Sequence, residues 1–177
     1  ELQLLTDAQR LRQRELEAMQ TQLKVLNEEL SEQTLTDALT GLKNRRAFDR
    51  MLATEHARVL RTRSSVGLLM VDVDHFKAYN DQYGHQAGDQ ALRAVAGAIQ
   101  SEARTYDHVT RYGGEEFSVI LPDTHVADAR AVAERIRLAV QALKGLHRPV
   151  TVSVGIATVS YTHLTLPTSG VEAGAEG

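Results

Sequence analysis

The fold is decided by residues 66–74, which read VGLLMVDVD. A short, continuous apolar run of this kind is typical of a strand that is buried on both faces of a sheet. Two carboxylates, Asp72 and Asp74, stand at the carboxyl end of the run. Ligands of α/β sheets tend to bind outside the carboxyl ends of the strands, so a functional site is expected at this end.

Further strands are predicted on the C-terminal side. Residues 108–112 and 116–121 alternate or run apolar on either side of Gly113 and Gly114, which predicts a β-hairpin. Residues 149–158 supply another β-rich run.

Amphipathic helices are predicted between these strands: one capped by Asn44 and ending at Ser64-Ser65, one over about 88–102 and one over 124–143. Their apolar stripes are typical of core positions rather than of cofactor contacts. Strands that alternate with such helices predict the α/β or α+β class. The predicted stripes consist of Phe48, Met51, Leu52, Val59 and Leu60 in the first helix, Leu92, Val95, Ala96 and Ile99 in the second, and Val132, Ile136, Val140 and Leu143 in the third.

The N-terminal segment has a different pattern. Residues 2–33 contain neither Gly nor Pro, and mostly apolar residues recur at alternating spacings of three and four. This heptad seam predicts a parallel dimeric coiled coil over 1–34, with polar interruptions at Gln9 and Arg12. The alternative is an amphipathic helix that packs on its own domain.

Composition limits the classes of ligand. The 177 residues carry a formal net charge of −3, which provides no general basic field for nucleic acid. There is no cysteine, so a metal would be a hard cation held by oxygen ligands or an ion bound by His. No apolar run is long enough to span a bilayer, which predicts a cytoplasmic chain. The chain begins without Met, so an upstream sensor or an inner-membrane segment is expected to precede it in the full protein.

Two acidic positions from distant parts of the sequence are expected to meet. Asp72 ends the buried strand and Glu115 follows the hairpin glycines. If the two strands are neighbours, the carboxylates converge, and their repulsion is relieved by a cation such as Mg²⁺. Gly113 and Gly114 have no side chains, so a ligand can approach the backbone there.

The chain resembles the GGDEF diguanylate cyclases over about residues 35–158. The resemblance rests on five motifs, DALTGLKNRR at 37–46, DVDHFKAYND at 72–81, GHQAGD at 84–89, RYGGEEF at 111–117 and VSVGIA at 152–157. It implies a central sheet like that of nucleotide cyclases and polymerase palms, with surrounding helices. The implied activity joins two GTP molecules into cyclic di-GMP, a bacterial second messenger, and releases pyrophosphate.

The resemblance also implies roles for single residues. Asp72, the backbone carbonyl of Val73 and Glu115 would hold Mg²⁺ or Mn²⁺, and Glu116 would hold a second ion or assist deprotonation of the ribose 3′-hydroxyl. Glu115 and Glu116 are therefore the catalytic pair. The implied substrate contacts are Asn80, Asp89 and His85 at guanine and Phe76 and Lys77 along the phosphate path, and the implied inhibitory product site consists of Arg104, Asp107 and Arg135.

The reaction joins two nucleotides, so the resemblance implies a homodimer with facing domains, formed through residues 1–34. Family members continue past the VSVGIA strand into a helix and strand with basic residues, which this sequence lacks. Residues 159–177 are therefore expected to be a non-native tail derived from a sequencing adapter. Two other interpretations stay open: a non-catalytic module that binds GTP or cyclic di-GMP, and a dimerising signal helix with a passive domain.

Overall fold

The computed structural model describes residues 12–13, 16–17, 19–22 and 35–160. The chain divides into two units, Glu1–Leu35 and Thr36–Gly177. In the first unit, residues 12–13, 16–17 and 19–22 are helical and exposed, and the Gln13 amide donates to the Glu17 carboxylate at 3.1 Å. The rest of the predicted coiled coil, and residues 161–177 of the expected tail, lie outside the described residues. Among the residues described, no helix is both long and apolar enough to cross a membrane.

The second unit is built on one five-stranded mixed sheet in the order β1-β3-β4-β2-β5. The parallel pair is β1 with β3, and β3–β4, β4–β2 and β2–β5 are antiparallel. The predicted hairpin and buried strand are confirmed as β3–β4 and β2. The strands are β1 (Lys43–Asn44), β2 (Ser65–Val73), β3 (His108–Arg111), β4 (Glu116–Pro122) and β5 (Val152–Ser160).

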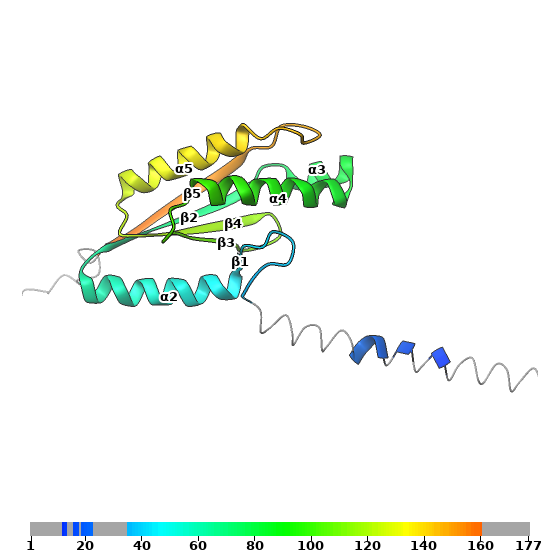
Figure 1. Ribbon diagram of the computed structural model, residues 1–177, viewed down its shortest axis with the longest axis horizontal. Helices are drawn as coiled ribbons and strands as arrows, with labels where there is room; N and C mark the ends of the chain where they lie inside the picture. Colours follow the sequence, from blue (N-terminus) through cyan, green and yellow to red (C-terminus); the bar gives the residue numbers. More distant parts are fainter. Residues whose placement is uncertain (1–11, 14–15, 18, 23–34, 161–177) are drawn as a thin grey trace, which may run out of the picture. The chain divides into compact units, whose positions relative to one another are not determined.

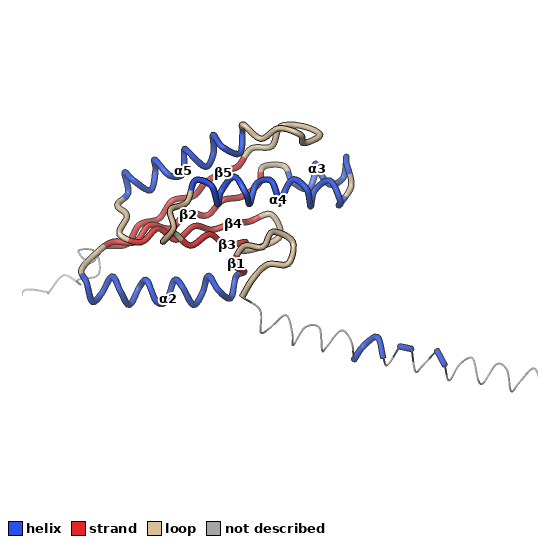
Figure 2. Tube along the Cα trace, in the orientation of Figure 1, coloured by secondary structure: helices blue, strands red, loops and turns tan. Residues whose placement is uncertain are grey.

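Helices cover both faces of the sheet (Figure 1). The helix α2 (Arg45–Thr62) lies on one face, and α3 (Phe76–Tyr83), α4 (His85–Glu102) and α5 (Val126–Gln141) lie on the other. Figure 2 shows the strands as a layer between α2 and the α4–α5 pair. The arrangement confirms the predicted class of a sheet with surrounding helices.

Side-chain alternation along β2 gives the two cores. Leu69, Val71 and Val73 are buried in the core that contains the residues of α3, α4 and α5. Val66 is buried with Phe48 and Val59 of α2 in a smaller core on the other face. A strand that is apolar on both faces must be covered on both faces. The apolar run 66–71 therefore predicts the helices found on the two sides of the sheet.

The smaller core leaves an apolar groove of about 460 Å³ beside α2. Its walls come from one side of α2 and from the facing residues of β2 and β5. The lining residues are Asp49, Leu52, Ala53, His56, Val66, Leu68, Ala157 and Val159.

The structure corrects several details of the predicted helices. Leu60, predicted to be buried, is 45% exposed, whereas Glu55 of the same helix is buried. The helix predicted from about residue 88 begins at His85, and α3 was not predicted as a helix. The last strand runs to Ser160, two residues beyond the expected end of the domain at 158.

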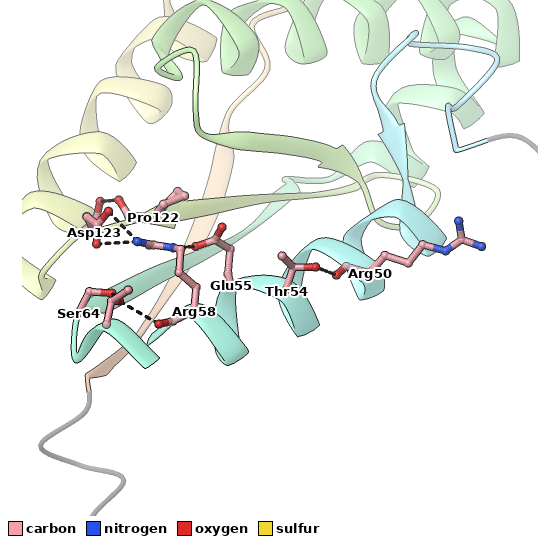
Figure 3. A network of polar contacts seen from close by, with 9 residues as sticks. Arg50, Thr54, Glu55, Arg58, Ser64, Pro122 and Asp123 are labelled. Carbon is pink, nitrogen blue, oxygen red and sulfur yellow. Dashed lines mark hydrogen bonds and ion pairs between the residues drawn. The ribbon is translucent and has the colours of Figure 1, made fainter. Parts of the chain in front are cut away.

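The N-terminal end of α2 is capped as predicted, because the Asn44 side chain accepts from the Ala47 amide at 3.1 Å. Near its other end, Arg58 joins the helix to the loop after β4 (Figure 3). Its Nε lies 2.7 Å from a carboxylate oxygen of Glu55, and its Nη1 lies 3.0 and 2.9 Å from the two carboxylate oxygens of Asp123. This pairing explains how the helix tolerates a buried glutamate.

Candidate active site at the end of strands β2 and β4

Strands β2 and β4 are neighbours, as the prediction for Asp72 and Glu115 required, and the residue directly opposite Asp72 in the antiparallel register is Glu116. The Val73 amide donates to the Glu115 carbonyl at 3.2 Å, which extends the ladder by one residue. Directly opposite residues of antiparallel strands project from the same face, so the Asp72 and Glu116 side chains share a face.

Three carboxylates lie at this end of the two strands, those of Asp72, Glu115 and Glu116. In the described part of the chain, Asp72, Glu115 and Glu116 have no basic side chain in an ion pair with them. Asp72 and Glu116 are exposed and Glu115 is half-buried, so oxygen atoms remain accessible to a ligand.

The donor set fits a hard divalent cation such as Mg²⁺ or Mn²⁺, which prefers carboxylate and carbonyl oxygen. Within the described residues, no three His, Asp or Glu side chains are grouped closely enough to hold a metal ion by themselves. Mg²⁺ usually takes one or two protein carboxylates and completes its shell with water and substrate phosphate oxygens. Two carboxylates with access to solvent are therefore the protein ligands that such an ion would need.

Two backbone hydrogen bonds close the turn between β3 and β4. The amides of Tyr112 and Gly113 donate to the Glu116 carbonyl at 2.8 and 3.1 Å. A Cβ atom on Gly113 would collide with the Glu116 carboxylate, whereas a Cβ on Gly114 would meet open space. A side chain at position 113 would therefore displace the Glu116 carboxylate from its place beside the turn.

Arg111 connects this turn to the entrance of the domain. Its guanidinium donates to the Gly114 carbonyl at 3.2 and 2.7 Å and to both carboxylate oxygens of Asp37 at 3.1 Å. Both residues lie in motifs of the sequence, DALTGLKNRR and RYGGEEF, but neither motif predicts an individual role for Asp37 or Arg111. Their 74-residue separation explains why the contact could not be read from the sequence.

The Asp37 carboxylate accepts hydrogen bonds from Thr40 as well as from Arg111. Burial raises the pKa of its carboxyl, but hydrogen bonds from the hydroxyl and amide of Thr40 and the charge and hydrogen bonds of Arg111 more than offset this, so the pKa is lowered. The carboxylate is accordingly charged at neutral pH and forms a charge-assisted pair with the guanidinium.

The predicted guanine residues lie at the α3–α4 corner. Asn80 of α3 lies against Gly88 of α4, where a Cβ atom would collide with the Asn80 carboxamide oxygen. That oxygen is buried and has no hydrogen-bond partner. Asp89, adjacent to Gly88, is half-buried, and His85 at the start of α4 is exposed. The structure thus brings Asn80 and the segment containing Asp89 together.

The two predicted phosphate-path residues begin α3. Phe76 is buried in the larger core and Lys77 is exposed. They follow His75, which has φ of 56° although it is not glycine. Such a residue is strained by about 1–2 kcal/mol and persists only where surrounding contacts fix it.

Asp74, the second carboxylate of the DVD sequence, has a different environment from Asp72. Its two carboxylate oxygens accept hydrogen bonds from the Ser153 hydroxyl at 2.7 Å and from the Thr151 hydroxyl at 2.6 Å. These bonds, from Ser153 first and then Thr151, lower the pKa of the Asp74 carboxyl. Asp74 is therefore engaged with the start of β5, whereas Asp72 is available to a ligand.

The three predicted product-site residues lie at the end of α4 and on α5. The Arg104 amide donates to an Asp107 carboxylate oxygen at 2.7 Å, and the other oxygen of Asp107 is buried without a partner. The exposed Arg104 guanidinium donates to the Tyr106 hydroxyl at 3.1 Å. Arg135 donates to the carboxylate and the carbonyl of Glu102, both at 3.1 Å, which places it beside the end of α4.

The chain is similar to known proteins over most of its length. The family described as "Diguanylate cyclase, GGDEF domain" matches residues 34–170. Diguanylate cyclase DgcP of Pseudomonas aeruginosa is 40% identical over 146 residues, covering 78% of this chain and 22% of the relative. Diguanylate cyclase VdcA of Vibrio cholerae is 41% identical over 150 residues, covering 83% of this chain and 43% of the relative. The chain thus spans less than half the length of either relative.

Among solved structures, the coiled coil and GGDEF domain of DgcB from Caulobacter crescentus, in complex with c-di-GMP, is similar to this chain. The identity is 33% and the TM-score is 0.68, with 84% of this chain and 82% of that chain covered.

Proposed function

The chain belongs to the GGDEF family of diguanylate cyclases, and from this membership and the site we propose that it condenses two GTP molecules into cyclic di-GMP. The observation that supports the proposal is the position of the three carboxylates at the ends of two neighbouring strands, where Asp72 lies directly opposite Glu116 and the Val73 amide donates to the Glu115 carbonyl. Carboxylates in this position can hold the cations of a metal-bound triphosphate.

Asp72, the Val73 carbonyl and Glu115 hold Mg²⁺ or Mn²⁺ in this proposal. Metal ions bound there would neutralise charge on the attacking and leaving oxygens of an in-line phosphoryl transfer. Glu116, on the same face as Asp72, holds a second ion or accepts the proton of the ribose 3′-hydroxyl. Gly113 and Gly114 leave the backbone of the turn accessible to the triphosphate.

Bond changes follow from the product. The 3′-oxygen of one GTP forms a bond to the α-phosphorus of the second, the bond from that phosphorus to the bridging oxygen breaks, and pyrophosphate leaves. The 3′-oxygen of the second nucleotide then attacks the α-phosphorus of the first, a second pyrophosphate leaves, and the ring closes. Since one site holds one nucleotide, the reaction needs two facing domains, and residues 1–34 would supply the dimer contact and raise the effective concentration of the partner.

The α3–α4 corner selects guanine. The partnerless Asn80 oxygen is an acceptor without a donor, and the guanine edge offers N–H donors. The carboxylate of Asp89 can accept from the same edge, with His85 nearby. Phe76 and Lys77 at the start of α3 lie along the phosphate path, where Lys77 supplies a positive charge.

Arg104, Asp107 and Arg135 form the proposed product site. The exposed guanidinium of Arg104 can donate to a phosphate or to a guanine edge, and the partnerless Asp107 oxygen is an acceptor. Cyclic di-GMP bound there would inhibit the enzyme, and an upstream sensor would act through residues 1–34.

The test is incubation of the chain with GTP and Mg²⁺, followed by chromatography for cyclic di-GMP. The chain should form the product, and Glu115→Gln should lower the rate by about 100-fold or more, because a charged ligand to the metal is lost. Glu134→Gln, the same change at an exposed site on α5, is the matched control and should match the unmodified chain. Nucleotide binding without any turnover would instead favour a non-catalytic binding module.

A further inference from the structure

Asp74 is bound to the start of β5 by three hydrogen bonds. Its amide donates to the Thr151 carbonyl at 3.0 Å, and its carboxylate accepts from the Thr151 and Ser153 hydroxyls at 2.6 and 2.7 Å. Bonds of this length to an ionised acceptor are among the stronger hydrogen bonds in proteins. Both carboxylate oxygens are therefore committed to β5.

Asp74 also directly precedes the strained residue of the site. His75 has φ of 56° and begins α3 without a side-chain cap. Its carbonyl accepts from the Tyr79 amide at 3.1 Å and from the Arg148 guanidinium at 3.3 Å. The left-handed turn is thus fixed on its N-terminal side by Asp74 and on its C-terminal side by Arg148 and the first turn of α3.

We propose that Asp74 is a positioning residue, which holds the β2–α3 turn against β5 and thereby orients the Val73 carbonyl and the first turn of α3 toward the nucleotide. This inference rests on the proposed function. The turn joins the end of β2, which carries Asp72, to the start of α3, which carries Lys77. If the turn relaxed to negative φ, α3 would leave β2 in another direction, and misplacement by about 1 Å costs up to 100-fold in rate.

The variants follow from the hydrogen-bond pattern. Asp74→Ala removes both acceptors. Asp74→Asn keeps one oxygen and adds a donor, and because a hydroxyl can accept as well as donate, both bonds to Thr151 and Ser153 can re-form. The pair Thr151→Val and Ser153→Ala removes the donors from the other side. Asp81→Asn, on the exposed surface of α3, is the matched control for loss of a carboxylate.

The first measurement is amide hydrogen exchange at Asp74 and Tyr79, whose amides donate to the Thr151 and His75 carbonyls on either side of the turn, and it requires no nucleotide. Exchange should be faster in Asp74→Ala and in the Thr151/Ser153 double variant, and close to that of the unmodified chain in Asp74→Asn and Asp81→Asn. Unchanged exchange in Asp74→Ala would overturn the inference, because the carboxylate would then not hold the turn.

The second measurement is the affinity for 3′-deoxy-GTP with Mg²⁺ together with kcat and KM for GTP. We expect Asp74→Ala to bind the analogue at least about tenfold more weakly and to lose up to about 100-fold in kcat/KM, with a raised KM. Asp74→Asn should restore most of both. A merely structural role would lower the active fraction and leave KM and the affinity of the folded molecules unchanged, and that result would overturn the inference.

Different results would refute the cyclase proposal and the positioning role of Asp74. If the unmodified chain binds 3′-deoxy-GTP but forms no product from GTP, the cyclase proposal is refuted, and the effect of Asp74→Ala on exchange and affinity still decides the positioning role. If the chain forms product and Asp74→Ala forms it with unchanged KM and kcat, the positioning role is refuted and the cyclase proposal stands.

Discussion

Removing the Arg58 side chain should destabilise the domain without affecting its chemistry. Arg58→Ala deletes the ion pair to Glu55 at 2.7 Å and the two bonds to Asp123 near 3 Å (Figure 3). Glu55 stays behind as a carboxylate with only 11% of its side chain exposed. A buried charge that has lost its partner is a recognised cause of large destabilisation.

The magnitude can be worked from the exposure of each partner. Breaking a fully buried pair costs about 3–5 kcal/mol, but the Arg58 side chain is 23% exposed, so we take about 2 kcal/mol for the Glu55 contact. The Asp123 side chain is 62% exposed, which limits that contact to about 0.5 kcal/mol. For a domain of this size the total of about 2.5 kcal/mol corresponds to a fall in Tm of about 10 °C.

Activity should be unchanged in the folded protein. Asp123 follows Pro122 of β4, and Pro122 pairs with Val66 near the start of β2. The candidate active site lies near the other end of β2, at Asp72. Six residues of strand separate the two ends by about 20 Å.

The assay is calorimetric or circular-dichroism melting of Arg58→Ala beside Arg61→Ala, an exposed arginine in the last turn of the same helix. Arg61→Ala should shift Tm by less than about 2 °C, as surface substitutions usually do. The double variant Glu55→Gln and Arg58→Met should recover part of the loss, since no buried charge remains. A Tm of Arg58→Ala equal to that of the Arg61→Ala control would refute a stabilising role for the Arg58 contacts.

Three further predictions concern the site and its surroundings. Gly88→Ala should displace the Asn80 carboxamide and weaken GTP binding about tenfold or more, measured by calorimetry, while the far-ultraviolet spectrum stays unchanged. The lowered folded pKa of Asp37 means that its contribution to stability is present above the unfolded value near 3.8 and is lost as pH falls through the folded pKa. Urea unfolding should therefore show Asp37→Asn less stable than the unmodified chain at pH 7, with the gap closing at acid pH; a constant gap would contradict the Arg111 contact. Arg104→Ala should abolish inhibition by added cyclic di-GMP in the turnover assay, and retained inhibition would rule out the proposed product site.

Much of the fold could be predicted because local patterns and tertiary structure agree. The apolar run of β2 and the Gly-Gly hairpin were correctly predicted as strands, and their pairing brings Asp72 opposite Glu116. The prediction for Asp72 and Glu115 required these two strands to be neighbours, and that requirement is met. The Asn44 cap of α2 was also predicted, because it depends on a local side-chain acceptor.

Other features depend on contacts that a sequence pattern does not contain. The helix α3 is short, and it starts from the left-handed residue His75 without a side-chain cap. The sequence therefore contains no capping signal that would predict its start. Glu55 is buried because Arg58 pairs with it, which reverses the usual preference of glutamate for the surface. The distinct environments of Asp72 and Asp74 follow from hydroxyls of β5 that lie 77 and 79 residues away from Asp74.

The most direct test of the central claim is the affinity for 3′-deoxy-GTP with and without Mg²⁺, in the unmodified chain and in Asp72→Asn. If the carboxylates hold a metal-bound triphosphate, Mg²⁺ should tighten binding to the unmodified chain by about tenfold or more, whereas it should have little effect on Asp72→Asn. Without metal the order should reverse, since the variant repels the free triphosphate less. An equal Mg²⁺ dependence in the two proteins would contradict a metal site at Asp72.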